Sequence, residues 1–143
     1  MQKKYDDIRY YLDLIPTPND QIPACIYGGF LVGFLIGGGV YSKEVISEDL
    51  VKNFNNKEKT GPQIYLELDG KLTSDMMQNE LVKFFDYYVE GENAPYQKDF
   101  GEVFFNEYKS PFEVDDSWDN FQKINNKITR SFTNWMISNP DIG

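Results

Sequence analysis

Residues 24–42, ACIYGGFLVGFLIGGGVYS, form the only long run of the chain without a charged side chain, and they hold six of its 11 glycines. Gly29, Gly33 and Gly37 recur every four residues, so in a helix they share one face and let a neighbouring backbone approach closely. The glycines at 37–39 would end such a helix, because glycine readily takes the left-handed conformation of a helix C-terminus. The run therefore predicts a buried central helix with a glycine face.

Two other interpretations of this run meet obstacles in the sequence. About 18 uncharged residues reach the minimum length of a membrane span, but the glycines dilute the hydrophobicity and no lysine or arginine cluster flanks the run. A phosphate-binding glycine loop requires a following Gly-Lys-Ser/Thr, which is absent. Charged residues also stand where the apolar core of a signal peptide would begin, at Tyr5-Asp6-Asp7. We therefore expect a cytoplasmic protein that does not span a membrane.

Apolar side chains recur at helical spacing in five further segments. These segments are residues 5–14, 45–54, 73–90, 100–108 and 115–135. Asp6 and Asp7 fall outside the apolar positions of the first segment, which places them on its solvent face. Residues 63–69 fit a short helix or a strand equally well. We predict a mainly α, single-domain protein over residues 1–143, a bundle of about five to seven helices around the central apolar, glycine-rich helix, with little or no sheet.

Local capping signals mark where several of these helices begin. Ser42 or Ser47 can cap the helix that follows the glycine run. Glu48 and Asp49 would then lie in its first turn, where their negative charges interact favourably with the helix dipole. Thr60 is a suitable cap for a helix with proline in its first turn. Ser117, preceded by two aspartates, marks the start of the last helix, which carries apolar residues every three or four positions.

The composition excludes several classes of function. The formal charge is −9 and the sequence pI is near 4.4, so the surface repels phosphate backbones and anionic lipids; we expect no nucleic-acid partner. The chain has no histidine, which removes the usual general base and the commonest zinc ligand. Its one cysteine, Cys25, is expected to be a buried, inert thiol. Asp69-Gly70-Lys71 resembles the middle of a calcium loop, but the register puts Tyr65 and Met76 at ligand positions. We predict no metal, no cofactor and no catalytic residues.

The best candidates for a binding role are acidic residues and tyrosines at the edges of the predicted helices. Carboxylates suit a basic partner, and tyrosine supplies contact area at low entropic cost. Four carboxylates surround the start of the last helix, more than helix capping requires. The predicted contacts are Tyr10, Tyr11, Asp13, Tyr87, Glu90, Glu113, Asp115, Asp116 and Asp119.

Several short motifs, in this order, resemble a family of small, uncharacterised bacterial proteins. They are Tyr5-Asp6-Asp7, the apolar glycine helix, Asp69-Gly70-Lys71-Leu72, an aromatic helix that follows Asn79-Glu80, Trp118 at the start of the last helix, and Phe132-x-x-Trp135. Members of that family often occur beside polymorphic or contact-dependent toxins, so the resemblance implies an immunity-type role. They tend to carry histidines where this chain has Tyr10, Tyr11 and Tyr27, so any chemistry of those histidines is absent here.

Four functions remain open at this point, of which the last is a small membrane-associated protein. The first is an immunity-type protein that binds and neutralises a cognate toxin, a basic protein partner, through its acidic, tyrosine-bearing surface. The second is a regulatory or adaptor module without catalysis, including a phage-borne one. The third is an enzyme that uses carboxylates such as Asp6 and Asp7, or Asp115 and Asp116, with a divalent metal. The glycine face leaves homo-oligomer formation open as well, since it can pack within the chain or against a second copy.

Overall fold

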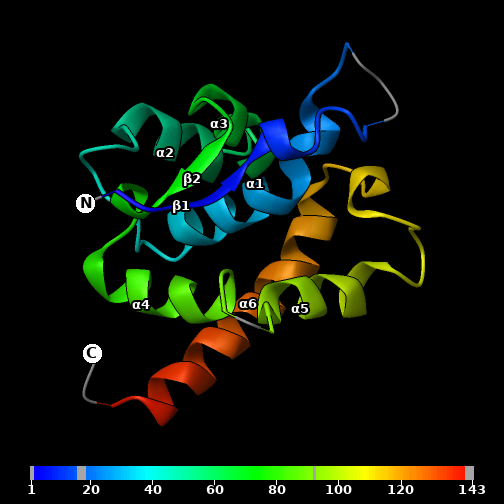
Figure 1. Cartoon of the computed structure of the whole chain (residues 1–143). Coiled ribbons are helices and arrows are strands. Elements are labelled where there is room, and N and C mark those ends of the chain that lie inside the picture. The colour runs from blue at the N-terminus through cyan, green and yellow to red at the C-terminus, as the bar shows by residue number, and fades with distance from the viewer. Residues whose placement is uncertain (1, 16–18, 92, 141–143) are drawn as a thin grey trace.

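The protein is a bundle of helices packed around one central helix, with a two-stranded sheet at its edge. The structure, a computed structural model, describes residues 2–15, 19–91 and 93–140. Figure 1 shows the arrangement of the elements. In chain order they are β1 (Lys4–Asp7), η1 (Ile8–Tyr10), α1 (Ile22–Gly37), α2 (Glu48–Asn55), α3 (Gly61–Glu67), β2 (Lys71–Thr73), η2 (Ser74–Met76), α4 (Asn79–Tyr88), α5 (Pro95–Phe104), η3 (Pro111–Glu113) and α6 (Trp118–Ser138). The predicted mainly α class, with little sheet, is confirmed.

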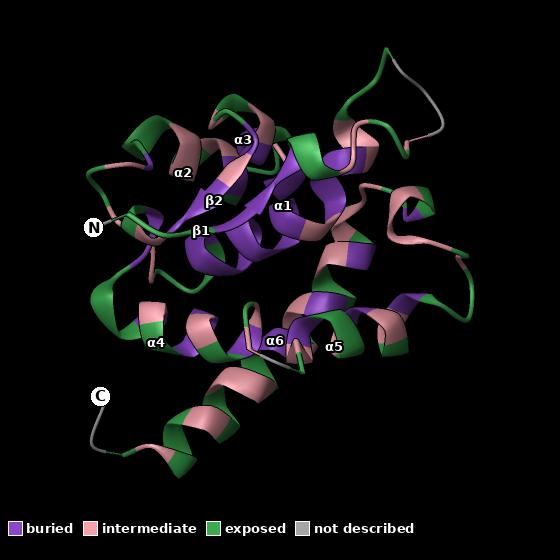
Figure 2. Cartoon of the chain, in the orientation of Figure 1, coloured by how far each residue is buried: buried purple, intermediate pink, exposed green. Residues whose placement is uncertain are grey.

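Helix α1 is the centre of the fold, as the apolar run predicts. Nearly all of it is buried, from Ala24 to Ile36, and Figure 2 shows it in purple with the other elements around it. The helix ends at the predicted glycines, with Gly38 as C-cap and Gly39 at φ +68°. No helix among the described residues is long and apolar enough to cross a membrane.

The glycine face of α1 receives helix α3 at backbone distance. A methyl group on Gly29 would lie 2.7 Å from the backbone nitrogen of Pro62, and one on Gly61 would overlap the carbonyl oxygen of Gly29. Gly33 is covered by Phe121 of α6, whose ring would lie 2.6 Å from an added methyl group. Gly37 differs, because it is exposed and its nearest neighbour would be 3.7 Å away. The close-packing face therefore comprises two of the three predicted glycines.

The predicted caps at Ser47, Thr60 and Ser117 are all present. The Ser47 hydroxyl accepts from the Leu50 N–H, and the Ser117 hydroxyl from the Asn120 N–H. Thr60 forms a reciprocal capping box with Gln63, which starts α3. Since residues 63–67 belong to α3, the ambiguous segment 63–69 is largely helical rather than a strand.

The N-terminal segment 5–14 is not the predicted amphipathic helix. Lys4–Asp7 form β1, which pairs antiparallel with β2, and a short 3₁₀ turn follows. The partner strand lies more than 60 residues away, so local periodicity could not report the pairing. The predicted helix over 73–90 also starts late, because Thr73 ends β2 and α4 begins at Asn79.

Aromatic rings join α4, α5 and α6 beneath α1. Phe84 of α4 lies 4.9 Å from Phe132 of α6 and 4.8 Å from Tyr88, measured between ring centroids. Phe100 and Phe104 of α5 are 4.8 Å apart and completely or almost completely buried. Stacked and tilted ring pairs such as these add about 0.5–1.5 kcal/mol each beyond the area they bury. They explain why so many aromatic residues serve the core rather than the surface.

Candidate functional site

Asp6 is a buried carboxylate held by two tyrosines. Its side chain lies beside Gly28 of α1. Its Oδ1 accepts a hydrogen bond from the Tyr11 hydroxyl at 2.6 Å, and its Oδ2 accepts one from the Tyr65 hydroxyl at 2.7 Å. Gly28 leaves the room for this cluster, since a methyl group there would lie 2.7 Å from the Tyr65 ring. Burial raises the pKa of Asp6, and the two tyrosine hydrogen bonds act against that rise. Asp6 is thus not on a solvent face, contrary to the prediction.

Asp7 is equally buried but has cationic partners. Lys4 Nζ lies 3.0 Å from Oδ2 and Arg9 Nη1 2.8 Å from Oδ1. Burial alone would raise the pKa of Asp7, but the hydrogen bonds from Arg9 and Lys4 outweigh it and bring the pKa down to about 2. Asp6 and Asp7 therefore face different partners and do not form a carboxylate pair that would hold one metal ion or share one proton.

Beside Tyr11 lies a cleft of about 420 Å³ with mainly aromatic walls, which we name the aromatic cleft. Four separate segments build it: the turn after η1, the first half of α1, helix α5 with the residue after it, and residues 109–112, which lead into η3 and form its start. The lining residues are Tyr11, Tyr27, Gln97, Phe100, Phe105, Lys109, Ser110, Pro111 and Phe112. Its size and lining are those of a small-molecule site. Tyr11 was predicted from the sequence, whereas the other walls were not.

Three of the predicted acidic residues lie together next to this cleft. Glu113 ends η3, Asp115 lies two residues further along the chain, and Asp119 lies in the first turn of α6. All three are exposed. We name these three residues the acidic edge. Their carboxylates make no salt bridge within the described part of the chain. The Tyr108 hydroxyl is 3.4 Å from Asp115 Oδ2.

The predicted residues of the N-terminal turn lie against the same region. The Tyr11 ring is 5.6 Å from that of Phe112, which brings the turn up to η3. Tyr10 is 59% exposed and has the Lys4 ammonium 5.2 Å from its ring centre, and Asp13 is exposed. The structure therefore gathers the two chain-distant parts of the predicted site at one end of α1.

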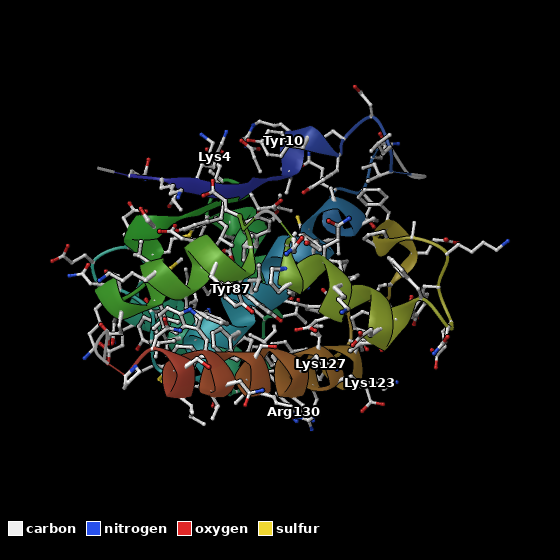
Figure 3. All side chains as sticks on the ribbon, turned by 60° about the horizontal axis from the view of Figure 1, so that its bottom comes forward. Lys4, Tyr10, Tyr87, Lys123, Lys127 and Arg130 are labelled. Carbon is white, nitrogen blue, oxygen red and sulfur yellow. The ribbon has the colours of Figure 1, made fainter. Side chains whose placement is uncertain are left out.

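The remaining predicted residues lie elsewhere or point inward. Tyr87 lies in the last turn of α4 and Glu90 two residues after its end, and Figure 3 shows Tyr87 well separated from Tyr10. Glu90 is already paired with Lys3 at 2.6 Å. Asp116 turns toward α3, where its Oδ2 accepts from the Thr60 hydroxyl at 2.7 Å, and burial raises its pKa. These three residues are not part of the acidic edge.

A row of basic side chains distinguishes the outer face of α6 from this acidic end. Lys123, Lys127 and Arg130 follow one another along the helix, as Figure 3 shows, and Lys127 pairs with Glu102 of α5 at 3.0 Å. The net charge of −9 is thus unevenly distributed over the surface. Among the described residues, no three side chains of histidine, cysteine, aspartate or glutamate come together as metal ligands would.

The comparisons with known proteins place the chain in a family without giving it an activity. A family model described as a domain of unknown function, DUF7832, matches residues 4–114. The match runs from β1 to η3 and includes every residue that lines the aromatic cleft, whereas α6 lies outside it. Searches of curated proteins and of solved structures found no match. The sequence motifs predicted an uncharacterised domain family, and since the match covers more than half of the chain, the protein belongs to the DUF7832 family.

Proposed function

We propose that the protein is a non-catalytic binding module that neutralises a basic protein partner, in the role of an immunity protein toward a cognate toxin. The toxin as partner comes from the resemblance described above, and the mode of binding comes from the surface. The observation that supports it is the acidic edge: exposed carboxylates at Glu113, Asp115 and Asp119 without a cationic partner in the described part of the chain.

Some of the other carboxylates are paired within the chain, whereas those of the acidic edge are not. Asp7, Glu67 and Glu102 each face a lysine or arginine within 3.0 Å. Such pairs neutralise part of the acidic surface locally. Exposed carboxylates such as Glu44 and Glu80 also make no salt bridge among the described residues, so the acidic edge is set apart by the exposed aromatic rings beside it. Unpaired charges of one sign attract an oppositely charged partner and raise its association rate, an effect that salt screens.

Exposed aromatic rings beside the acidic edge supply contact area. Tyr10 is 59% exposed and Phe105 is 47% exposed. Both lie near Phe112: the Tyr10 ring contacts Tyr11, which contacts Phe112, and Phe105 lines the same cleft as Phe112. Interfaces are enriched in aromatic residues at their centre, with polar residues around them. We therefore place the partner over the acidic edge and these rings, and not over Tyr87 and Glu90.

A charge-reversal experiment tests this proposal. The double variant Glu113→Lys/Asp115→Lys is compared with Glu44→Lys/Glu80→Lys, which changes the net charge equally. Gln78, two residues before Glu80, donates its backbone N–H to the Val40 carbonyl just after α1, and Glu44 follows Val40 by four residues. The control residues therefore lie at the opposite end of α1. The probe is a toxin whose gene adjoins the gene for this chain, and the absence of such a gene would count against the immunity role. Binding is measured by surface plasmon resonance at several salt concentrations.

We expect the acidic-edge variant to lose at least about tenfold in association rate and most of its salt dependence. The control should stay within about twofold, and only the edge variant should fail to rescue cells that express the toxin. Equal losses in both variants would remove the acidic edge from the proposal. Binding of the wild type without any rescue would favour the adaptor function over neutralisation.

A further inference from the structure

The walls of the aromatic cleft are fixed from behind by the core. The Tyr11 hydroxyl is bound to buried Asp6, and the Tyr27 ring lies 4.6 Å from fully buried Tyr96. On the cleft side, the Tyr27 and Phe100 rings are 5.2 Å apart at an angle of 60°. Walls held in this way lose little entropy when a ligand enters, which favours binding of a flat, apolar molecule.

The polar groups of the cleft carry a specific chemical preference. Lys109 is the one charged side chain that lines it, and its ammonium makes no salt bridge among the described residues. Tyr27, Gln97 and Ser110 also line the cleft, and neither the Tyr27 hydroxyl nor the Gln97 amide has a hydrogen-bond partner within the described ranges. Free donors on an aromatic wall suit a ligand with a negatively charged acceptor group.

We infer that the aromatic cleft is a binding site for a small planar aromatic anion, a molecule of one or two fused rings that carries a carboxylate or a sulfonate. The rings of Tyr27, Phe100 and Phe112 would contact the faces and edges of the ligand. Lys109 would meet its anionic group, with the Tyr27 hydroxyl or the Gln97 amide as an additional donor. The volume of about 420 Å³ lies within the range of small-molecule sites.

The sign of the ligand's charge separates this site from the acidic edge. Glu113 follows Phe112 in the chain, but it does not line the cleft, whereas Lys109 does. A cationic aromatic molecule would be placed next to an ammonium group, and an anionic one would be attracted to it. The proposed partner surface shares Phe105 with the cleft, but the inference does not depend on the proposed function, because it rests on Lys109, Tyr27 and Phe112 and on a ligand of the opposite charge.

Three naphthalene compounds with the same ring system and different charges test the inference. They are 2-naphthoate, neutral 2-naphthol and cationic 2-naphthylmethylammonium, titrated into the ¹⁵N-labelled full-length protein and followed by amide chemical shifts. We expect 2-naphthoate to bind with a Kd of about 1 mM or tighter, as its size permits. Its shifts should centre on the amides of Gln97, Ser110 and Phe112, and the cation should bind at least about threefold more weakly.

Single substitutions then assign the role of each donor. Lys109→Gln should weaken 2-naphthoate about threefold and leave 2-naphthol unchanged, and Tyr27→Phe should weaken it by about threefold to tenfold. Lys123→Gln on the outer face of α6 is the matched control and should have no effect. Absence of binding at 5 mM 2-naphthoate, shifts that centre outside the cleft, or equal affinity for the anion and the cation would each overturn the inference. Loss of binding in the control as well would do the same.

Discussion

The contact between α1 and α3 predicts that one methyl group at Gly29 destabilises the protein, although alanine is the better helix former. In a free helix, Gly→Ala stabilises by about 1 kcal/mol. At Gly29 the new methyl group would lie 2.7 Å from the Pro62 nitrogen and 2.9 Å from its Cγ, where ordinary contacts begin at 3.4 Å. The methyl group would also overlap the Pro62 Cα, so helix α3 would have to move by more than about 0.7 Å, and such overpacking costs typically 1–3 kcal/mol.

The cost should be at the upper end of this range, because the obstacle is the backbone of a capped helix rather than a flexible side chain. We expect a net loss of about 2 kcal/mol for Gly29→Ala. Gly37→Ala is the matched control, since it makes the same change in the same helix at an exposed position whose nearest neighbour is 3.7 Å away. It should be neutral or stabilise the protein by up to about 1 kcal/mol.

Urea unfolding followed by circular dichroism measures both variants. With a slope of about 2 kcal/mol per molar urea, the midpoint should fall by about 1 M for Gly29→Ala and rise by up to about 0.5 M for Gly37→Ala. If Gly29→Ala is as stable as the wild type, the helices do not approach at backbone distance. If both variants lose stability equally, glycine serves α1 in a way unrelated to packing.

Three further predictions concern buried polar groups. The pKa of Asp7 is lowered to about 2 in the folded protein, so its ionised form stabilises the fold at pH values above its unfolded pKa near 3.9. Asp7→Asn should therefore lower the free energy of unfolding by about 1–2 kcal/mol at pH 7, and the difference from the wild type in urea midpoint should vanish as the pH falls from 4 toward 2. A difference that does not depend on pH would contradict the pairing. Thr60→Ala should lower the free energy of unfolding by about 1–2 kcal/mol, because α3 loses its cap and Asp116 loses its hydrogen-bond donor. Thr60→Ser keeps the hydroxyl and should retain most of the wild-type thermal stability. If it does not, the hydroxyl is not the cause of the loss. Burial raises the pKa of Cys25 to about 12, so its thiol should resist Ellman's reagent at pH 8 until urea unfolds the protein, and fast reaction of the folded protein would contradict its burial.

The parts of the fold that the sequence predicts are those with local causes. The extent of α1 follows from uninterrupted apolar residues and from the glycines after them. A capping serine or threonine accepts a hydrogen bond from the backbone N–H three residues further along the chain, so its partner is local as well. The strand β1 has no such local signal. Tyr5 and Ile8 fit helical spacing, but the backbone of residues 4–7 pairs with residues 71–73, and that long-range pairing decides its conformation.

The residues of the candidate site also differ in whether their arrangement has a local or a long-range cause. Glu113, Asp115 and Asp119 lie close together in the chain, so their acidic edge is visible in the sequence. The aromatic cleft draws its walls from four segments spread between residues 11 and 112, and each ring alone fits the pattern of a core residue. The inward turns of Asp6 and Asp116 also depend on partners far away in the chain, at Tyr65 and Thr60. Sequence patterns do not report such tertiary contacts.

The all-round burial of α1 has a consequence for synthesis of the chain. Its cover comes from both sides of the sequence: β1 precedes it, whereas α3 and Phe121 of α6 follow it. From the end of α1 at Gly37 to the end of α6 at Ser138, a ribosome needs about 5–20 s at ~5–20 residues per second. During that interval the most apolar segment of the nascent chain has no complete cover, so it is the natural target for a chaperone on the ribosome. The helix that organises the finished protein is thus the segment most in need of protection while the protein is made.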